Sequence, residues 1–586
     1  MNIRHLLPIF AAFAMAVSCR QGAADGEHVL HVLSTNDVHG TWFDSTYVGT
    51  GVKKSLFAAN HYIDSVRNAD GAENVLLIDV GDCLQGDNAP YYYNYVDTVT
   101  PHLFPRLVSY MKYDAVIVGN HDIETGHPVY DRVAADLESY GIPFLAGNAI
   151  RNDNGKTYFP AYKVFDKAGL KVLLLGYTNP NIKAWLDEHL WKGMSFESLL
   201  PLVQQDVDRL KSKIRPDVTI VAVHSGAGNG DGTVLENQAM DLYNSIKGVD
   251  LIAYAHDHKP YVGSKDGMGI INSGSHSRNV AHAEITVNVK NGKPSVDRIE
   301  TELIPVSADK ADPKMREAFA KDYDAVKTFT LRKVGELKAD LVTREAYKGM
   351  CPYMDFIHTI GLQYADLSIA APLTFNGTVT KGTLIYNDLF TIYPFENQMF
   401  VLKMTGDEIK KYLEYSYDNW INTVKDIKAA AAGKSDEHVL KIKQAADSRY
   451  GQTSWSFEAR PYNFDSAAGI DYTVDVTKPF GERIDIVSMA DGSDFDPAHE
   501  YTVSMTSYRA SGGGGILENG AGIKDADSRT VERYPEYREL IYNYLQDNSA
   551  IDPSAIAKNG KLGHWEFIPE SDASKAISRD MGLLFR

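Results

Sequence analysis

Five short polar clusters in this chain combine side chains that can bind metal ions or carry a proton. These side chains are Asp37 and His39, Asp82, Asn120 and His121, His224, and His256 with His258. Imidazole and carboxylate groups without a thiolate suit Zn²⁺, Mn²⁺ or Fe better than Ca²⁺. The clusters therefore predict a centre of two divalent metal ions, and the sequence leaves their identity open among Zn, Mn, Fe and Co.

The ligand types also predict how two ions would share these residues. Two metal ions a few ångströms apart need a common ligand, and a carboxylate with its two oxygens serves best. Asp82 is the expected bridge. One site would be completed by Asp37, His39 and His258, and the other by Asn120, His224 and His256.

Each polar cluster directly follows a short apolar run that is typical of a buried β-strand. The runs are Val29–Leu33, Val75–Val80, Ala115–Val118, Val218–Val223 and Leu251–Ala255. Open α/β sheets place their sites at the carboxyl ends of the strands, so the polar residues are expected to meet there. Gly81, Gly86 and Gly119 would let the backbone turn sharply beside an anionic ligand. A single cluster would be explained as a turn or a cap, but five in order favour a metal site.

The ordered motifs D-x-H, GD, GNH, H-S-G and H-x-H resemble those of the calcineurin-like metallophosphoesterases. More narrowly, the chain is similar to the secreted 5′-nucleotidase family, which includes UDP-sugar hydrolases and 2′,3′-cyclic-nucleotide 2′-phosphodiesterase/3′-nucleotidases. The resemblance covers about residues 29–549. It implies an α/β fold: a four-layer sandwich of two packed β-sheets flanked by helices, followed by a separate α+β substrate-binding domain.

The resemblance also implies which residues carry the chemistry. In that family the Asn of GNH binds the second metal and the next His is catalytic, so His121 takes that role here. The family orients this His with an Asp three residues further on, where this chain has Glu124. The final metal ligand of the family is often Gln or His, and His258 stands at that position. The expected reaction is hydrolysis of a phosphate ester by a metal-activated water.

Composition and charge agree with an ordinary soluble protein of two large domains. The 586 residues are too many for one core, and 44% are hydrophobic and 23% charged. The net charge of −18 argues against a nucleic-acid-coating protein, which would carry a basic stripe. The sequence does not indicate an oligomeric state.

The N-terminus is typical of an export signal. Arg4 and His5 precede the apolar run Leu6–Val17, which is twelve residues long, whereas a membrane span needs about 20. The small residues before Cys19 resemble a bacterial lipobox, so we expect residues 1–18 to be a signal peptide and Cys19 to be lipidated. An ordinary signal peptidase site is the alternative. The prediction is an exported lipoprotein, periplasmic or on the cell surface, with residues 19–28 as a tether.

The remaining chain divides into four predicted parts. Residues 29–300 form the metal domain, 301–332 a linker helix, 333–550 the substrate-binding domain and 551–586 a tail that either packs or frays. The linker helix is indicated by helix-forming residues and Pro313 between Asp312 and Phe329. In the second domain, Thr405 and Glu408 form a capping box for an amphipathic helix.

The resemblance places substrate contacts in the second domain. Phe395 after Pro394 and Tyr508 before the glycine run correspond to the aromatic residues that stack on the nucleobase, and Asn397 and Arg509 lie beside them. Stacking contributes about 1–3 kcal/mol per base and tolerates different bases. The alternative for each aromatic residue alone is a place in the core.

Two features bear on the substrate. The 5′-nucleotidase branch has an Arg nineteen residues before the stacking Phe, and that count gives Asn376 here; its Asp in the glycine loop falls on Gly514. The segment Tyr508–Ala510 instead resembles the cyclic phosphodiesterase/3′-nucleotidase branch. We therefore expect an exported enzyme that hydrolyses nucleotide phosphate esters. The alternatives are a UDP-sugar hydrolase, a phosphoesterase for other esters, and a surface nucleotide-binding protein without turnover.

Overall fold

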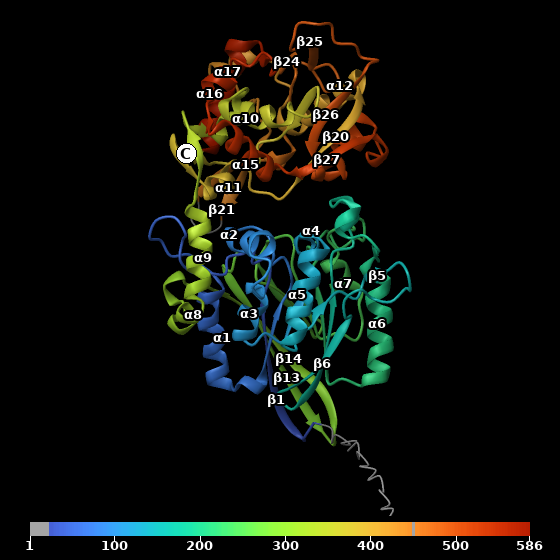
Figure 1. Cartoon of the computed structure of the whole chain (residues 1–586). Helices are drawn as coiled ribbons and strands as arrows, with labels where there is room; N and C mark the ends of the chain where they lie inside the picture. The colour runs from blue at the N-terminus through green and yellow to red at the C-terminus, as the bar shows by residue number, and fades with distance from the viewer. Residues whose placement is uncertain (1–22, 448–451, 586) are drawn as a thin grey trace, which may run out of the picture.

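The structure is a computed structural model that describes residues 23–447 and 452–585. Figure 1 shows two bodies, with the second half of the chain above the first and helix α9 (Ala320–Leu331) running between them. The lipidation predicted at Cys19 lies outside the described residues. Within the described ranges, no helix has the length and apolar character needed to cross a membrane.

The first domain is built on two six-stranded sheets. One contains, in spatial order, β14 (Lys293–Pro305), β13 (Asn279–Lys290), β1 (Gly26–Thr35), β2 (Val75–Asp79), β3 (Ala115–Ile117) and β4 (Phe144–Leu145). The other contains β11 (Tyr261–Lys265), β12 (Met268–Asn272), β10 (Leu251–Tyr254), β9 (Val218–Val223), β7 (Leu170–Tyr177) and β6 (Tyr162–Lys167). The strands that precede the five polar clusters are β1, β2, β3, β9 and β10, and they run parallel to their neighbours among these.

Alternation along the strands produces four layers. Leu76 and Ile78 of β2 point into a core shared by the two sheets, where they join Leu174 and Ile220 of the other sheet. Leu77 points the other way and packs under α1 (Leu56–Asp70), α3 (Leu103–Tyr110) and α5 (His127–Ser139). Helices α6 (Leu199–Ile214) and α7 (Ala239–Ser245) cover the outer face of the other sheet. The strands are apolar on both faces because both are covered, which confirms the predicted sandwich.

Two of the predicted domain boundaries fall inside strands. Strand β1 begins at Gly26 and pairs with β13 from Gly26↔Val289 onward, so the last three residues of the predicted tether belong to the sheet. Strand β14 runs to Pro305, five residues beyond the predicted end of the domain. In the linker, α8 (Pro313–Ala318) and α9 are two separate helices. Phe319 between them has φ −111° and ψ 18°, which are not α-helical values.

The second domain has a mixed α+β architecture around a five-stranded sheet. Its strands are β23 (Ser466–Ala468), β17 (Leu367–Ala370), β26 (Glu500–Thr506), β20 (Gln398–Thr405) and β27 (Thr530–Glu536). Helix α12 (Gly406–Trp420) begins at the predicted capping box, in which the Thr405 hydroxyl accepts from Glu408 N–H and the Glu408 carboxylate accepts from Thr405 N–H. Its buried face includes Ile409, Tyr412 and Leu413.

The last segment of the chain packs against this domain. Strand β29 (Trp565–Ile568) pairs in parallel with β24 (Ile470–Asp475), and α17 (Glu570–Leu584) buries Ala573 and Ile577 in the same core. Of the two possibilities for residues 551–586, the structure therefore shows packing. Cys83 and Cys351 are both buried free thiols, as expected for cysteines of two different domains.

Candidate metal centre and substrate cavity

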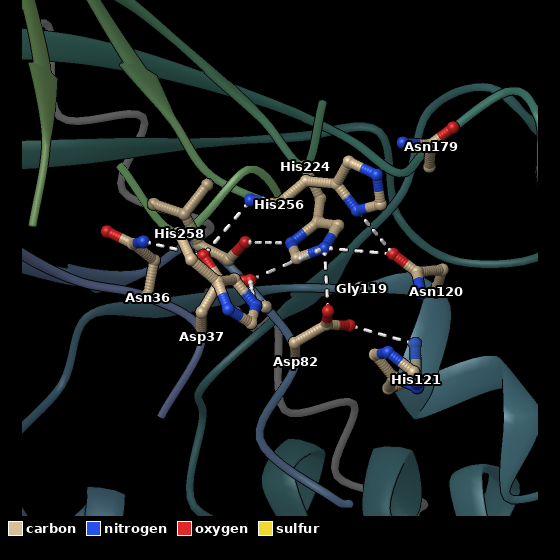
Figure 2. A network of polar contacts seen from close by, with 12 residues as sticks. Asn36, Asp37, Asp82, Gly119, Asn120, His121, Asn179, His224, His256 and His258 are labelled. Atoms are coloured by element: carbon tan, nitrogen blue, oxygen red, sulfur yellow. Dashed lines mark hydrogen bonds and ion pairs between the residues drawn. The ribbon is translucent and has the colours of Figure 1, made fainter. Parts of the chain in front are cut away.

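The predicted ligands meet at the carboxyl ends of the strands in two groups. In each group the candidate ligand atoms lie within 4.8 Å of one another; one group is Asp37, His39 and His258, and the other is Asp82, His224 and His256. Asn120 joins the second group, because its Oδ1 lies 3.1 Å from His224 Nε2 and 2.9 Å from His256 Nδ1. Figure 2 shows the side chains of Asp37, Asp82, Asn120, His224, His256 and His258 gathered together.

Asp82 belongs to the second group and also interacts electrostatically with His39 of the first. One of its carboxylate oxygens lies 3.0 Å from His224 Nε2, and the other accepts from His121 N–H at 2.8 Å. Burial disfavours the charge on Asp82, yet the imidazoles of His224, His121 and His39 hold the pKa of its carboxyl well below the ordinary value. A charged carboxylate that faces imidazoles of both groups is the ligand that two cations could share.

His39 and His224 each use one ring nitrogen in a hydrogen bond to the backbone and keep the other nitrogen available for a metal ion. His39 Nδ1 donates to Gln85 O at 3.1 Å and His224 Nδ1 donates to Val80 O at 2.6 Å, so in each neutral ring the Nε2 lone pair faces the site. Ligating histidines usually donate their other N–H to an oxygen in this way. This donor set fits divalent metal ions.

His256 uses the opposite tautomer, because its Nε2 donates to Glu236 Oε1 at 2.9 Å. Its Nδ1 is then the nitrogen available to an ion. The sequence analysis did not identify Glu236. This residue lies in the irregular segment between β9 and α7, well after the end of the strand. The chain offers no periodic signal by which it could have been found.

Backbone strain gathers at the same residues. Asp37, His39, Asp82, His256 and His258 have φ values of 47°, 46°, 61°, 84° and 59°, in the left-handed region. Such conformations cost about 1–3 kcal/mol each in residues other than glycine and cluster at functional sites. Asp37 is also fully buried, and its Oδ1 lies 3.5 Å from His258 Nε2. Both observations indicate side chains held ready for a ligand, since backbone strain and a buried carboxylate otherwise only destabilise the fold.

Asp122 holds the two loops that carry Asp82 and Asn120. Its carboxylate accepts from the backbone N–H groups of Asp82, Cys83, Leu84 and Gly119, at 3.0, 2.9, 3.0 and 2.8 Å. It is fully buried. The sequence reasoning explained this GNHD segment, taken alone, as a possible turn, and did not assign Asp122 a role.

Glycine is required where these loops cross. A Cβ on Gly119 would lie 2.2 Å from Asp82 Oδ1, and one on Gly81, whose φ is +96°, would lie 2.7 Å from His224 Nδ1. The expectation that these glycines allow close approach is therefore met, although the close neighbours are the ligands themselves.

His121 lies beside the metal centre, on α4 (Asn120–Glu124). Its Nδ1 is 2.5 Å from Glu124 Oε2, so the longer side chain at this position still reaches the imidazole. Burial alone would lower the pKa of His121, but the carboxylates of Asp82 and Glu124 raise it to about 10. The pair can therefore hold a proton next to the metal centre.

A cavity of about 810 Å³ joins the metal centre to the second domain. From the first domain it is lined by Asp82, Asn120, His121, His256 and His258, and from the second by the four predicted substrate contacts Phe395, Asn397, Tyr508 and Arg509. This volume is within the usual range for a small-molecule site. The residues predicted for chemistry and for substrate binding thus share one cavity.

The environment of Arg509 differs from that expected of a substrate contact. It is almost fully buried, and its guanidinium bonds Asp465 Oδ2 at 2.8 Å and Tyr462 O at 2.9 Å. The position identified by counting, Asn376, does not line the cavity. Arg460, which does, was missed by the sequence reasoning.

Two protein families match this chain. Residues 30–260 match the calcineurin-like phosphoesterases, and residues 333–519 match the 5′-nucleotidase C-terminal domain. The chain belongs to the family of proteins in which a calcineurin-like phosphoesterase domain is followed by a 5′-nucleotidase C-terminal domain.

Relatives agree over most of the chain at low identity. The trifunctional nucleotide phosphoesterase protein of Bacillus subtilis is 22% identical over 95% of this chain, which spans 40% of the length of that relative. The 2′,3′-cyclic-nucleotide 2′-phosphodiesterase/3′-nucleotidase of Haemophilus influenzae is 22% identical, with 97% of this chain and 92% of that protein covered. A putative 5′-nucleotidase from Staphylococcus aureus has a similar fold, with a TM-score of 0.73, 21% identity, and 92% and 99% of the two chains covered.

Proposed function

We propose that this protein is a two-metal phosphoesterase that hydrolyses phosphate esters of nucleotides. The observation that carries the proposal is the shared cavity, which is lined both by candidate metal ligands and by the aromatic residues Phe395 and Tyr508. Asp37, His39 and His258 would hold one ion, Asn120, His224 and His256 the other, and Asp82 both. The ions, when bound, would activate a water and neutralise phosphoryl oxygens.

The protein supplies the rest of the chemistry. His121, oriented by Glu124, carries a proton at the edge of the centre and is placed to stabilise or protonate the leaving oxygen of the ribose. Phe395 and Tyr508 would bind the base at the other end of the cavity. Domain motion at the linker helices would admit the substrate.

The proposed substrate preference is for 2′,3′-cyclic and 3′-nucleotides at least as much as 5′-nucleotides. It is supported by the likeness of Tyr508–Ala510 to the cyclic phosphodiesterase branch and by the name of the Haemophilus relative. The Arg of the 5′-nucleotidase branch is also absent at the corresponding position, which is Asn376 here.

A substrate panel tests the proposal. Chelated protein is assayed with AMP, 3′-AMP, 2′,3′-cyclic AMP and UDP-glucose, with Mn²⁺, Zn²⁺ or Co²⁺ added back. We expect no turnover without metal, restored turnover with it, and a ratio of kcat/KM for 2′,3′-cyclic AMP over AMP of one or more. Nucleotide binding without turnover under any metal would identify a nucleotide-binding protein instead, and UDP-glucose as the preferred substrate would identify a UDP-sugar hydrolase.

We further propose that the protein is exported and anchored by a lipid on Cys19. The support is the apolar run Leu6–Val17 followed by small residues and Cys19. A Cys19→Ser variant would then leave the membrane fraction and lose incorporation of labelled fatty acid. Unchanged fractionation and labelling would contradict the anchor.

A further inference from the structure

Phe395 and Tyr508, the two aromatic residues predicted to stack on the base, are called the base clamp below. A third aromatic ring, that of Tyr462, contacts both of them. Its centroid lies 6.5 Å from that of Phe395 at an interplanar angle of 83°, and 6.1 Å from that of Tyr508 at 89°. Any base stacked flat on Phe395 or Tyr508 would therefore stand perpendicular to Tyr462. Edge-to-face contact is a favoured geometry between aromatic rings. Tyr462 thus has the orientation of an end wall for a stacked base.

Buried contacts hold this wall in place. Arg509 Nη2 donates to Tyr462 O at 2.9 Å, while its Nε pairs with Asp465 Oδ2 at 2.8 Å. Arg509 Nη1 also donates to Gly513 O in the glycine run. Two longer bonds, from Nη1 to Asn463 Oδ1 and from Nη2 to Asp465 Oδ1, both 3.3 Å, occupy the remaining donors, so all five N–H groups of Arg509 face protein acceptors. This buried cation therefore ties the 462–465 segment to the glycine segment after Tyr508. Tyr462 and Tyr508 therefore lie on segments that the same arginine holds together.

Arg460 is placed differently from Arg509. It lies two residues before Tyr462, it is exposed, and it lines the same cavity. Among the described residues its guanidinium has no hydrogen-bond or ion-pair partner. An unpaired guanidinium in a substrate cavity suits a phosphate, since charge-assisted bonds from Arg to phosphate are short and strong.

We propose that Arg460 and Tyr462 form a nucleotide-recognition element, in which Tyr462 closes the end of the base slot and Arg460 pairs with the phosphate. This inference rests on the proposed nucleotide hydrolysis and names two contacts within it. The 5′-nucleotidase branch has an Arg at the position of Asn376, and we assign the role of that Arg to Arg460 instead. Tyr462 acts on the base and Arg460 on the anionic group, so the two contacts can be separated by substrate.

The test compares AMP with ribose 5-phosphate, which lacks the base. Tyr462→Ala should lower kcat/KM about tenfold or more for AMP and leave ribose 5-phosphate unchanged, because only the base meets the ring. Tyr462→Phe keeps the ring and should stay within about threefold of wild type. Arg460→Gln should lower kcat/KM about tenfold for both substrates, through KM, because both carry the phosphate.

Binding of adenosine gives a readout that does not depend on turnover. Its inhibition constant should rise about tenfold in Tyr462→Ala and stay unchanged in Arg460→Gln, since adenosine has the base but no phosphate. Lys403→Gln removes one charge from an exposed site outside the cavity and serves as the control for Arg460. The unchanged ribose 5-phosphate activity also reports that Tyr462→Ala is folded.

The outcomes separate this inference from the proposed function. Equal losses for AMP and ribose 5-phosphate in Tyr462→Ala, or none, would overturn the base-wall role. An Arg460→Gln variant no worse than Lys403→Gln would overturn the phosphate contact. Wild-type protein that prefers ribose 5-phosphate to AMP would instead refute nucleotide specificity itself.

Discussion

Asp122 offers a sharp test of how the metal centre is supported. Its carboxylate accepts from four backbone N–H groups of the two loops that carry Asp82 and Asn120. Asp122→Asn keeps one oxygen and replaces the other with an NH₂ group, which cannot accept. Two of the four buried donors then lose their partner, and each costs about 1–3 kcal/mol. The expected loss is about 2–6 kcal/mol, a large share of the usual stability of about 5–15 kcal/mol.

Hydrogen exchange measures this loss where it occurs. A chain of two domains does not unfold as one unit, so a single melting temperature would mix the domains. We expect faster amide exchange in Asp122→Asn at Asp82–Leu84, together with weaker metal binding, because the loop no longer fixes Asp82. Asp153→Asn, which removes an exposed carboxylate away from the centre, is the control. Wild-type exchange and metal affinity in Asp122→Asn would refute the view that this carboxylate organises the site.

Three further predictions concern the centre. His121→Ala should lower kcat about 10²–10⁴-fold while keeping both metal ions, which are counted by elemental analysis; loss of metal would mean that His121 is a ligand. Glu236→Ala should weaken binding of one ion about 10–100-fold by titration calorimetry, because it removes the oxygen that accepts from His256; an unchanged affinity would show that Glu236 does not support the centre. Metal affinity should rise with pH. Burial alone would lower the pKa of His224, but the carboxylates of Asp82 and Asp37 raise it to about 9. Below that pH, a metal ion that binds His224 must displace a proton. The apparent affinity should therefore increase between pH 7 and 9 and level above, and a flat profile would contradict the proton displacement.

The sequence predicted the strands and the ligand cluster because both depend on short-range patterns. Apolar runs such as Val75–Val80 are buried on both faces, and a residue that follows such a strand must lie at the sheet edge. The coupling of His121 to Glu124 is also local, since residues three apart on a helix are neighbours.

What the sequence could not predict depends on contacts between distant segments. Arg509 pairs with Asp465, 44 positions earlier, and no pattern in either segment shows that the pair will be buried. Tyr462 lies in a single 3₁₀ turn (Pro461–Asn463) and Glu236 in an irregular segment, and neither position is marked by a periodic pattern. Strand β29 pairs with β24 at Tyr472↔Trp565, which is again a contact between distant segments.

The central claim is that Asp82 is shared by two metal ions, and metal content tests it most directly. Wild-type and Asp82→Asn proteins are stripped, reloaded with Mn²⁺, Zn²⁺ or Co²⁺, desalted and analysed for metal per chain, with turnover measured on the same samples. We expect two ions per chain and activity in the wild type, and a reduced stoichiometry with loss of turnover in Asp82→Asn. Two ions retained by Asp82→Asn with near-normal turnover would contradict the account.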